Sequence, residues 1–146
     1  MDLAPPRNGA AARLARGVCR ALAALGYGAL TEFPLGSGRR VDVIGLNAAG
    51  EIVIVEIKSS PADFRGDRKW PDYLGFCDLF YFAVPEDFPR ELLPADCGLM
   101  VADDYGAEIV RPAPSLGLHG SRRRAQTLRF ALAASLRLHR FVDSEA

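Results

Sequence analysis

The sequence predicts an α/β fold in which a helix, three antiparallel strands, a crossover helix and a fourth strand follow one another along the chain. Two hydrophobic runs, residues 41–46 and 52–57, are separated by the turn Asn47-Ala48-Ala49-Gly50, which is typical of a β-hairpin. A second glycine-rich turn, Gly36-Ser37-Gly38, precedes them. Apolar residues recur at helical spacing near both ends of the chain, so we expect helices beside a mixed sheet.

The first helix is expected over residues 7–25, where Gly26 can end it. Its buried stripe consists of Leu14, Val18, Leu22 and Leu25. The meander follows, and Ser59-Ser60-Pro61 breaks its last strand. The later elements are expected to be a loop and helix over 63–76 with Pro71 in the first turn, a buried strand over 79–84, short strands over 98–101 and 107–110, an irregular segment over 111–120, and a helix from a cap at Ser121 to about His139.

The hairpin turn determines which residues face one another. Asn47 suits the first position of a type I turn, and Gly50 suits the left-handed position that closes a three-residue loop. Counting outward from this loop predicts two cross-strand pairs. These are Asp42 with Glu56, and Arg40 with Lys58.

The preceding turn extends the same argument to Glu32. If residues 36–38 also form a three-residue loop between strands 29–35 and 39–46, Glu32 lies opposite Asp42 and extends the row of carboxylates. Either glycine can take the left-handed position, and a different loop length turns Glu32 to the other face of the sheet.

Two opposed carboxylates require compensation, because like charges facing each other across a strand pair are destabilising. A hard cation such as Mg²⁺ supplies it, since this ion binds one or two carboxylates, several waters and phosphate oxygens. Lys58 lies two residues after Glu56 and therefore on the same face. The alternative is a surface ion pair beside a solvated Asp42, but residues 52–55 are apolar on both faces, which favours a buried, compensated site.

The pattern of Asp42 followed by Glu56-Ile57-Lys58 resembles the PD-(D/E)XK nuclease superfamily, although Val41 stands where that pattern has proline. Longer blocks resemble the MmcB family of bacterial DNA repair proteins within this superfamily. They cover roughly residues 39–140. These blocks are Gly38 to Val43, Ile54 to Ser60, Asp63-Phe64-Arg65, Asp67 to Tyr73, Cys77 to Val84 and Ala102 to Ala107.

The resemblance implies a restriction-endonuclease-like core and Mg²⁺-dependent cleavage of DNA during repair, with Mn²⁺ as a substitute. It implies Asp42, Glu56 and Ile57 as metal ligands and Lys58 as the catalytic lysine, and we add Glu32 to the catalytic candidates. The residues expected to contact DNA are Arg40, Arg65, Lys69, Tyr73, Arg129 and Arg137. The alternative is a noncatalytic DNA-binding or adaptor module on the same fold.

The final helix carries a stripe of arginines, namely Arg122, Arg129, Arg137 and Arg140. The stripe is either a track for DNA phosphates or the solvated face of a helix that packs through Leu128, Leu132 and Leu136. On the crossover, Lys69 and Tyr73 can face the metal site and hold a phosphate or a water. Trp70 either belongs to the core or stacks on an unpaired base.

Composition narrows the remaining possibilities. The 146 residues have one domain's length, and no apolar run approaches the ~20 residues of a membrane span. The N-terminus lacks the pattern of a signal peptide, so we expect a cytoplasmic protein. The net charge is zero, which predicts weak nonspecific binding to DNA and leaves targeting to a repair-protein partner or to a DNA structure.

Overall fold

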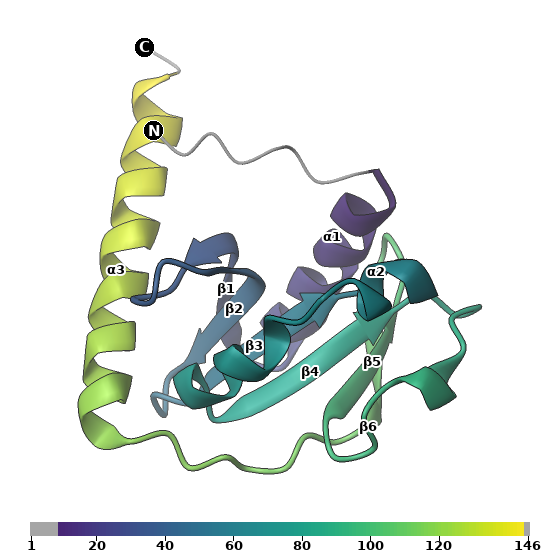
Figure 1. Ribbon diagram of the computed structural model, residues 1–146. Helices are drawn as coiled ribbons and strands as arrows, with labels where there is room; N and C mark the ends of the chain where they lie inside the picture. The colour runs from purple at the N-terminus through teal and green to yellow at the C-terminus, as the bar shows by residue number, and fades with distance from the viewer. Residues whose placement is uncertain (1–8, 145–146) are drawn as a thin grey trace.

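The computed structural model describes residues 9–144 and shows a mixed sheet with helices around it (Figure 1). The strands lie in the order β1-β2-β3-β4-β5-β6. In chain order the elements are α1 (Gly9–Ala24), β1 (Tyr27–Pro34), β2 (Arg40–Asn47), β3 (Ile52–Ile57), α2 (Pro61–Arg65), the 3-10 helix η1 (Trp70–Phe76), β4 (Leu79–Val84), the 3-10 helix η2 (Arg90–Leu92), β5 (Gly98–Ala102), β6 (Ala107–Arg111) and α3 (Gly120–Asp143). The predicted α/β architecture is confirmed. The expected start of the first helix, at Arg7, lies outside the described residues. Within the described part of the chain, no helix is long and apolar enough to cross a membrane.

Both predicted turns of the antiparallel meander are confirmed. The Asn47 N–H donates to the Glu51 carbonyl over 3.2 Å, and the Leu35 N–H donates to the Arg39 carbonyl over 2.7 Å. Gly50 and Gly38 hold the left-handed positions of the two loops, with φ of 82° and 89°. Strands β3, β4 and β5 then run parallel to one another, and β6 returns antiparallel to β5.

The crossover between β3 and β4 differs from the predicted single helix over 63–76. It consists of the five-residue α2 and the separate η1, in which Pro71 stands in the first turn as expected. The Asp67 carboxylate accepts hydrogen bonds from the backbone N–H groups of Lys69 and Trp70 over 2.7 and 3.2 Å. Because the Asp67 side chain binds these N–H groups, a new turn starts here and the α-helix does not continue.

The hydrophobic core has two parts, one on each face of the sheet. Helix α1 covers one face, where Leu14, Val18 and Leu22 belong to the same buried cluster as β2 and β3 residues. The crossover covers the other face, and the Trp70 ring packs against Phe80 and Phe82 with centroid separations of 5.8 and 5.1 Å. The prediction that Trp70 joins the core is therefore confirmed.

A close helix contact at Gly17 supports a prediction about stability. A Cβ atom at this position of α1 would lie 1.9 Å from the Asp103 carbonyl oxygen and 2.5 Å from that of Gly106. We expect Gly17→Ala to lower the free energy of unfolding by about 1–3 kcal/mol, because the helix must shift from the β5–β6 turn. Urea denaturation measures this. Gly120→Ala is the matched control, since its Cβ meets open space; equal losses in both variants would contradict the close contact.

Helix α3 overturns part of the prediction for the C-terminal segment. His119, not Ser121, is its cap, and the His119 Nδ1 accepts the Ser121 N–H over 3.3 Å. The leucines expected to pack inward instead face solvent. Leu128, Leu132 and Leu136 are 60%, 62% and 45% exposed.

The inner face of α3 is partly polar because the helix lies beside the edge strand β1 (Figure 1), and its apolar part includes Phe130, whose ring centroid is 6.2 Å from that of Phe33. An edge presents backbone carbonyls, which require hydrogen-bond donors and not leucines. Arg137 donates to the carbonyls of Thr31 and Glu32 over 2.7 and 3.1 Å. Nearer the start of the helix, Arg123 donates to the carboxylate of Asp78 over 2.6 and 2.5 Å.

Candidate active site

The two carboxylates predicted to face each other do meet, at the point where β2 and β3 separate. The ladder between these strands ends at Val43 and Val55. Beyond it, the Asp42 N–H donates to Glu56 Oε2 over 2.7 Å, and the Ile57 N–H donates to Asp42 Oδ2 over 2.8 Å. Each carboxylate thus replaces a backbone carbonyl, and we call this pair of exchanged bonds the carboxylate clasp.

The separation of the strands makes one predicted pair wrong. Arg40 does not pair with Lys58, because β2 at this end pairs only with β1, where Arg40 is opposite Pro34. The Lys58 N–H instead donates to the Ala83 carbonyl of β4 over 3.0 Å. The clasp therefore lies in the fork between two diverging strands.

Burial and mutual repulsion control the charge of the clasp. The Glu56 side chain is in the core, with 4% of the residue exposed. Burial and the Asp42 carboxylate together raise the pKa of Glu56 well above its ordinary value, while the Asp42 backbone N–H and Lys58 act in the opposite direction. Without a cation Glu56 therefore retains its proton more readily than a solvated glutamate would.

Lys58 is buried beside the clasp and is held by an aspartate that the sequence argument missed. Its Nζ atom lies 2.6 Å from Asp67 Oδ2 in an ion pair that is almost inaccessible to solvent. Burial favours a raised pKa for Asp67, but hydrogen bonds from Lys58 and from the Lys69 N–H bring the pKa below its ordinary value. Asp67 stays ionised and fixes the Lys58 ammonium. The only sequence signal for it was its place two residues before Lys69, as in an Asx turn.

Tyr73 also reaches the site, as predicted, although from a 3-10 helix. Its hydroxyl donates to the Arg40 carbonyl over 3.4 Å. Burial and the carboxylates of Glu56, Asp67 and Asp42 raise the pKa of Tyr73 to about 12. The phenol is therefore neutral near pH 7 and can donate a hydrogen bond.

Glu32 has the predicted register, in which it extends the row of carboxylates. The neighbouring pairs Thr31 with Val43 and Phe33 with Val41 place it opposite Asp42. Its φ of 48° is in the left-handed region, which is rare for a residue other than glycine. Within residues 9–144, no three side chains of aspartate, glutamate, histidine or cysteine are grouped so that they could bind one metal ion. Glu32 therefore does not complete a three-carboxylate site.

The other residues predicted to contact DNA are spread around this end of the sheet. Arg65 is exposed at the end of α2, and Lys69 is exposed just before η1. Arg129 lies over the turn at Gly36, about where a Cβ of that glycine would point. Arg137 faces β1 and donates to its carbonyls. The arginine stripe therefore lies on the side of α3 next to the body, and the alternative of a solvated face opposite packed leucines is wrong.

The donor set of the clasp fits a hard divalent cation. The backbone hydrogen bonds engage one oxygen of each carboxylate, namely Asp42 Oδ2 and Glu56 Oε2. Two carboxylates from adjacent strands, with water completing the coordination shell, are the ligands that Mg²⁺ prefers. The Ile57 side chain carries no ligand atom, so this residue can contribute only its backbone carbonyl.

Fold and site together define an α/β protein in which a half-buried and a buried carboxylate meet beside a buried lysine at one end of a mixed sheet. The chain belongs to the DNA repair protein MmcB-like family, whose model matches residues 5–145.

Two solved structures are similar to the chain. A protein of unknown function from Silicibacter pomeroyi, SPO1766, is 48% identical, with a TM-score of 0.88 over 100% of this chain and 97% of that one. A repair endonuclease from Pyrococcus abyssi is 21% identical, with a TM-score of 0.40 over 62% of this chain and 43% of that one, a likeness too low to carry an inference. No curated protein matches the chain.

Proposed function

We propose that this protein is a Mg²⁺-dependent endonuclease that hydrolyses DNA phosphodiester bonds during repair, and that Mn²⁺ can substitute. The observation that carries the proposal is the carboxylate clasp, in which the half-buried Asp42 meets the buried Glu56 beside the buried Lys58. Membership of a DNA repair family supports DNA as the substrate. The resemblance to the PD-(D/E)XK superfamily supports cleavage, and action on DNA implies residence in the cytoplasm.

In this proposal Asp42 and Glu56 bind the cation, with the Ile57 carbonyl as a further ligand. The cation, when bound, polarises the phosphate and lowers the pKa of a bound water. The backbone N–H groups of Asp42 and Ile57 orient the two carboxylates, because each binds one oxygen of the facing side chain. Water adds to phosphorus as one P–O bond breaks, which leaves a phosphate monoester and a hydroxyl group.

Lys58 stabilises charge in this scheme. Its ammonium donates to the attacking water or to a nonbridging phosphate oxygen, where negative charge develops. The ionised Asp67 holds Nζ in place through the ion pair. The neutral hydroxyl of Tyr73 can turn its proton from the Arg40 carbonyl to the same region. Glu32, which is opposite Asp42 in the strand register, is a further catalytic candidate in this proposal.

The test is direct incubation of purified protein with end-labelled single-stranded, duplex and flap DNA. We expect cleavage products with Mg²⁺ or Mn²⁺ and intact DNA with a chelator in excess. Denaturing gel electrophoresis separates the products from the substrates.

A second candidate function is a noncatalytic adaptor that recruits other repair proteins to DNA. The exposed leucines of α3 favour it, because a large apolar surface on a monomer often marks a contact with another protein. If every DNA structure stays intact with both metals while DNA is still bound, the adaptor function replaces the endonuclease.

A further inference from the structure

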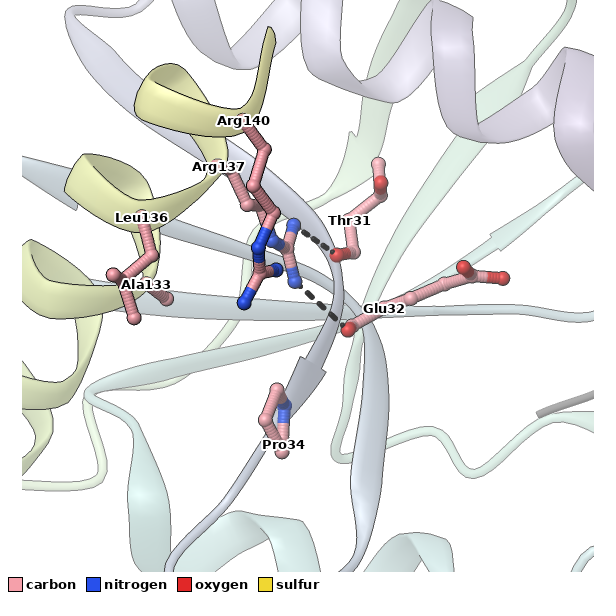
Figure 2. A pocket seen from close by; sticks show the side chains of 7 residues that line it. All are labelled: Thr31, Glu32, Pro34, Ala133, Leu136, Arg137 and Arg140. Atoms are coloured by element: carbon pink, nitrogen blue, oxygen red, sulfur yellow. Dashed lines mark hydrogen bonds between the residues drawn. The ribbon is translucent and has the colours of Figure 1, made fainter. Parts of the chain in front are cut away.

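A groove separates helix α3 from the edge strand β1, and its volume is about 810 Å³. Thr31, Glu32 and Pro34 line it from the strand, and Arg137 and Arg140 line it from the helix (Figure 2). Figure 2 shows both guanidinium groups directed into the groove. The Glu32 carboxylate points the other way, away from the two arginines.

The charge of the two arginines is not neutralised in the groove. Arg137 donates from Nη1 and Nη2 to the carbonyls of Thr31 and Glu32, which are neutral acceptors. A guanidinium has five N–H donors, so three of Arg137 remain. In the described part of the chain, neither Arg137 nor Arg140 forms an ion pair with a carboxylate, and Arg140 is exposed.

Two adjacent cations that share no carboxylate favour an anion with several acceptor oxygens. Guanidinium groups match the oxygens of a phosphate, with which they form charge-assisted hydrogen bonds. Arg137 is already fixed by the two β1 carbonyls, so its remaining donors point in set directions. Arg140, which has the freedom of an exposed side chain, can close on the same anion.

The groove is close to the carboxylate clasp. Glu32 is opposite Asp42 in the register of β1 and β2, and Asp42 contacts Glu56 of β3. Strand β1, which lines the groove, is therefore two strand spacings, roughly 10 Å, from Glu56 on β3. Successive phosphates of one DNA strand advance by about 3.4 Å along the helix axis. If one phosphate of a DNA strand lies at the clasp, a phosphate a few nucleotides further along the same DNA strand therefore lies in the groove.

We propose that the groove between β1 and α3 binds the phosphodiester backbone of the substrate strand, a few phosphates from the bond that is cut, with Arg140 as the principal contact and Arg137 as the fixed one. This inference rests on the proposed function, because it assigns the same substrate to a second site. The groove site differs from the arginine stripe predicted from the sequence, since the groove excludes Arg122 and requires strand β1 as its opposite wall.

The test compares Arg140→Gln with Arg124→Gln. Both variants remove one arginine charge from α3, and both side chains are exposed. The positions are sixteen residues apart, which is about 160° around a helix with ~100° per residue, so Arg124 points away from the groove. Arg137 is a poorer choice, because its replacement also removes the two bonds that hold Thr31 and Glu32.

The probe is a fluorescein-labelled DNA, single-stranded or duplex, with Ca²⁺ in place of Mg²⁺ and anisotropy measured from about 50 to 200 mM salt. We expect Arg140→Gln to weaken binding by about fivefold to tenfold at ~0.1 M salt and to reduce the slope of log affinity against log salt by about one. Arg124→Gln should match wild type in both. Thermal melting checks that the two variants are equally folded.

The possible outcomes distinguish a failure of the groove proposal from a failure of the endonuclease proposal. If Arg140→Gln and Arg124→Gln bind DNA equally well, or if wild type binds neither form of DNA, the groove is not a phosphate site, whether or not wild type cleaves. If only Arg140→Gln loses affinity and wild type cleaves nothing with Mg²⁺ or Mn²⁺, the groove is upheld and the endonuclease proposal fails. A loss confined to Arg140→Gln together with metal-dependent cleavage supports both.

Discussion

Lys58→Ala is expected to lower the rate of DNA cleavage by about 10²-fold or more, because one electrostatic stabiliser of the developing phosphate charge is lost. Metal binding and DNA binding should largely survive, since the clasp and the remote phosphate contacts remain. Single-turnover cleavage with Mg²⁺ measures the effect, and calorimetry with Mn²⁺ checks the metal site. Lys58→Arg should restore little activity, because a planar guanidinium cannot occupy the position of a compact ammonium 2.6 Å from Asp67.

Asp67→Asn tests how much of the contribution of Lys58 depends on its being held in place, because Lys58 itself is retained. An asparagine oxygen can still accept the N–H groups of Lys69 and Trp70, but the ion pair with Lys58 is lost. We expect a smaller loss of activity than in Lys58→Ala. A Lys58→Ala protein that is folded and cleaves as fast as wild type would remove the lysine from the mechanism.

Asp42→Asn should abolish Mn²⁺ binding and yet melt no lower than wild type in the absence of metal. The asparagine oxygen can still accept the Ile57 N–H, and the backbone bond from position 42 to Glu56 is unchanged. The lost charge is the one that repels Glu56. Calorimetry measures the affinity for Mn²⁺, and thermal melting with a chelator measures stability. Asp87→Asn, an exposed aspartate after β4, is the control.

The raised pKa of Glu56 also predicts how the free energy of unfolding depends on pH in wild type and in Asp42→Asn. In wild type the folded-state pKa of Glu56 is above its ordinary value of 4.5, so the native protein binds more protons than the unfolded chain between these two values. The metal-free free energy of unfolding therefore falls as pH rises through this interval. The fall should be smaller in Asp42→Asn, and Mn²⁺ affinity in wild type should rise with pH, because metal and proton compete. Unchanged Mn²⁺ affinity in Asp42→Asn would contradict the metal site.

The hairpins and the meeting of Asp42 with Glu56 could be predicted from the sequence because short-range rules determine them. A glycine at the left-handed position fixes the loop length, and the loop length fixes the register. Gly38 and Gly50 hold those positions in the structure. Trp70 and strand β4 were predictable for a related reason, since apolar residues must be covered.

Long-range contacts were not predictable in this way. Asp67 is nine residues from Lys58, and their pairing depends on where α2 ends. The separation of β2 from β3 beyond Val43 requires side chains to replace backbone acceptors, which no pattern of hydrophobicity reveals. For α3 the helical period was correct, but one of the two interpretations packed the leucines inward. That interpretation assumes a helix packed on a sheet face, whereas α3 lies along a sheet edge.

The polar attachment of α3 has a thermodynamic consequence. Arg123 and Arg137 join the helix to the body through a carboxylate and two carbonyls. Phe130 adds an apolar contact with Phe33, whereas the leucines of the helix face solvent. A helix held in this way is released in a local opening at a lower free energy than the strands of the core. The groove exists only while α3 is docked, so an anion that occupies it binds the closed state alone and favours closure by mass action. The order of the 24-residue helix α3 and the occupancy of the groove are therefore linked equilibria.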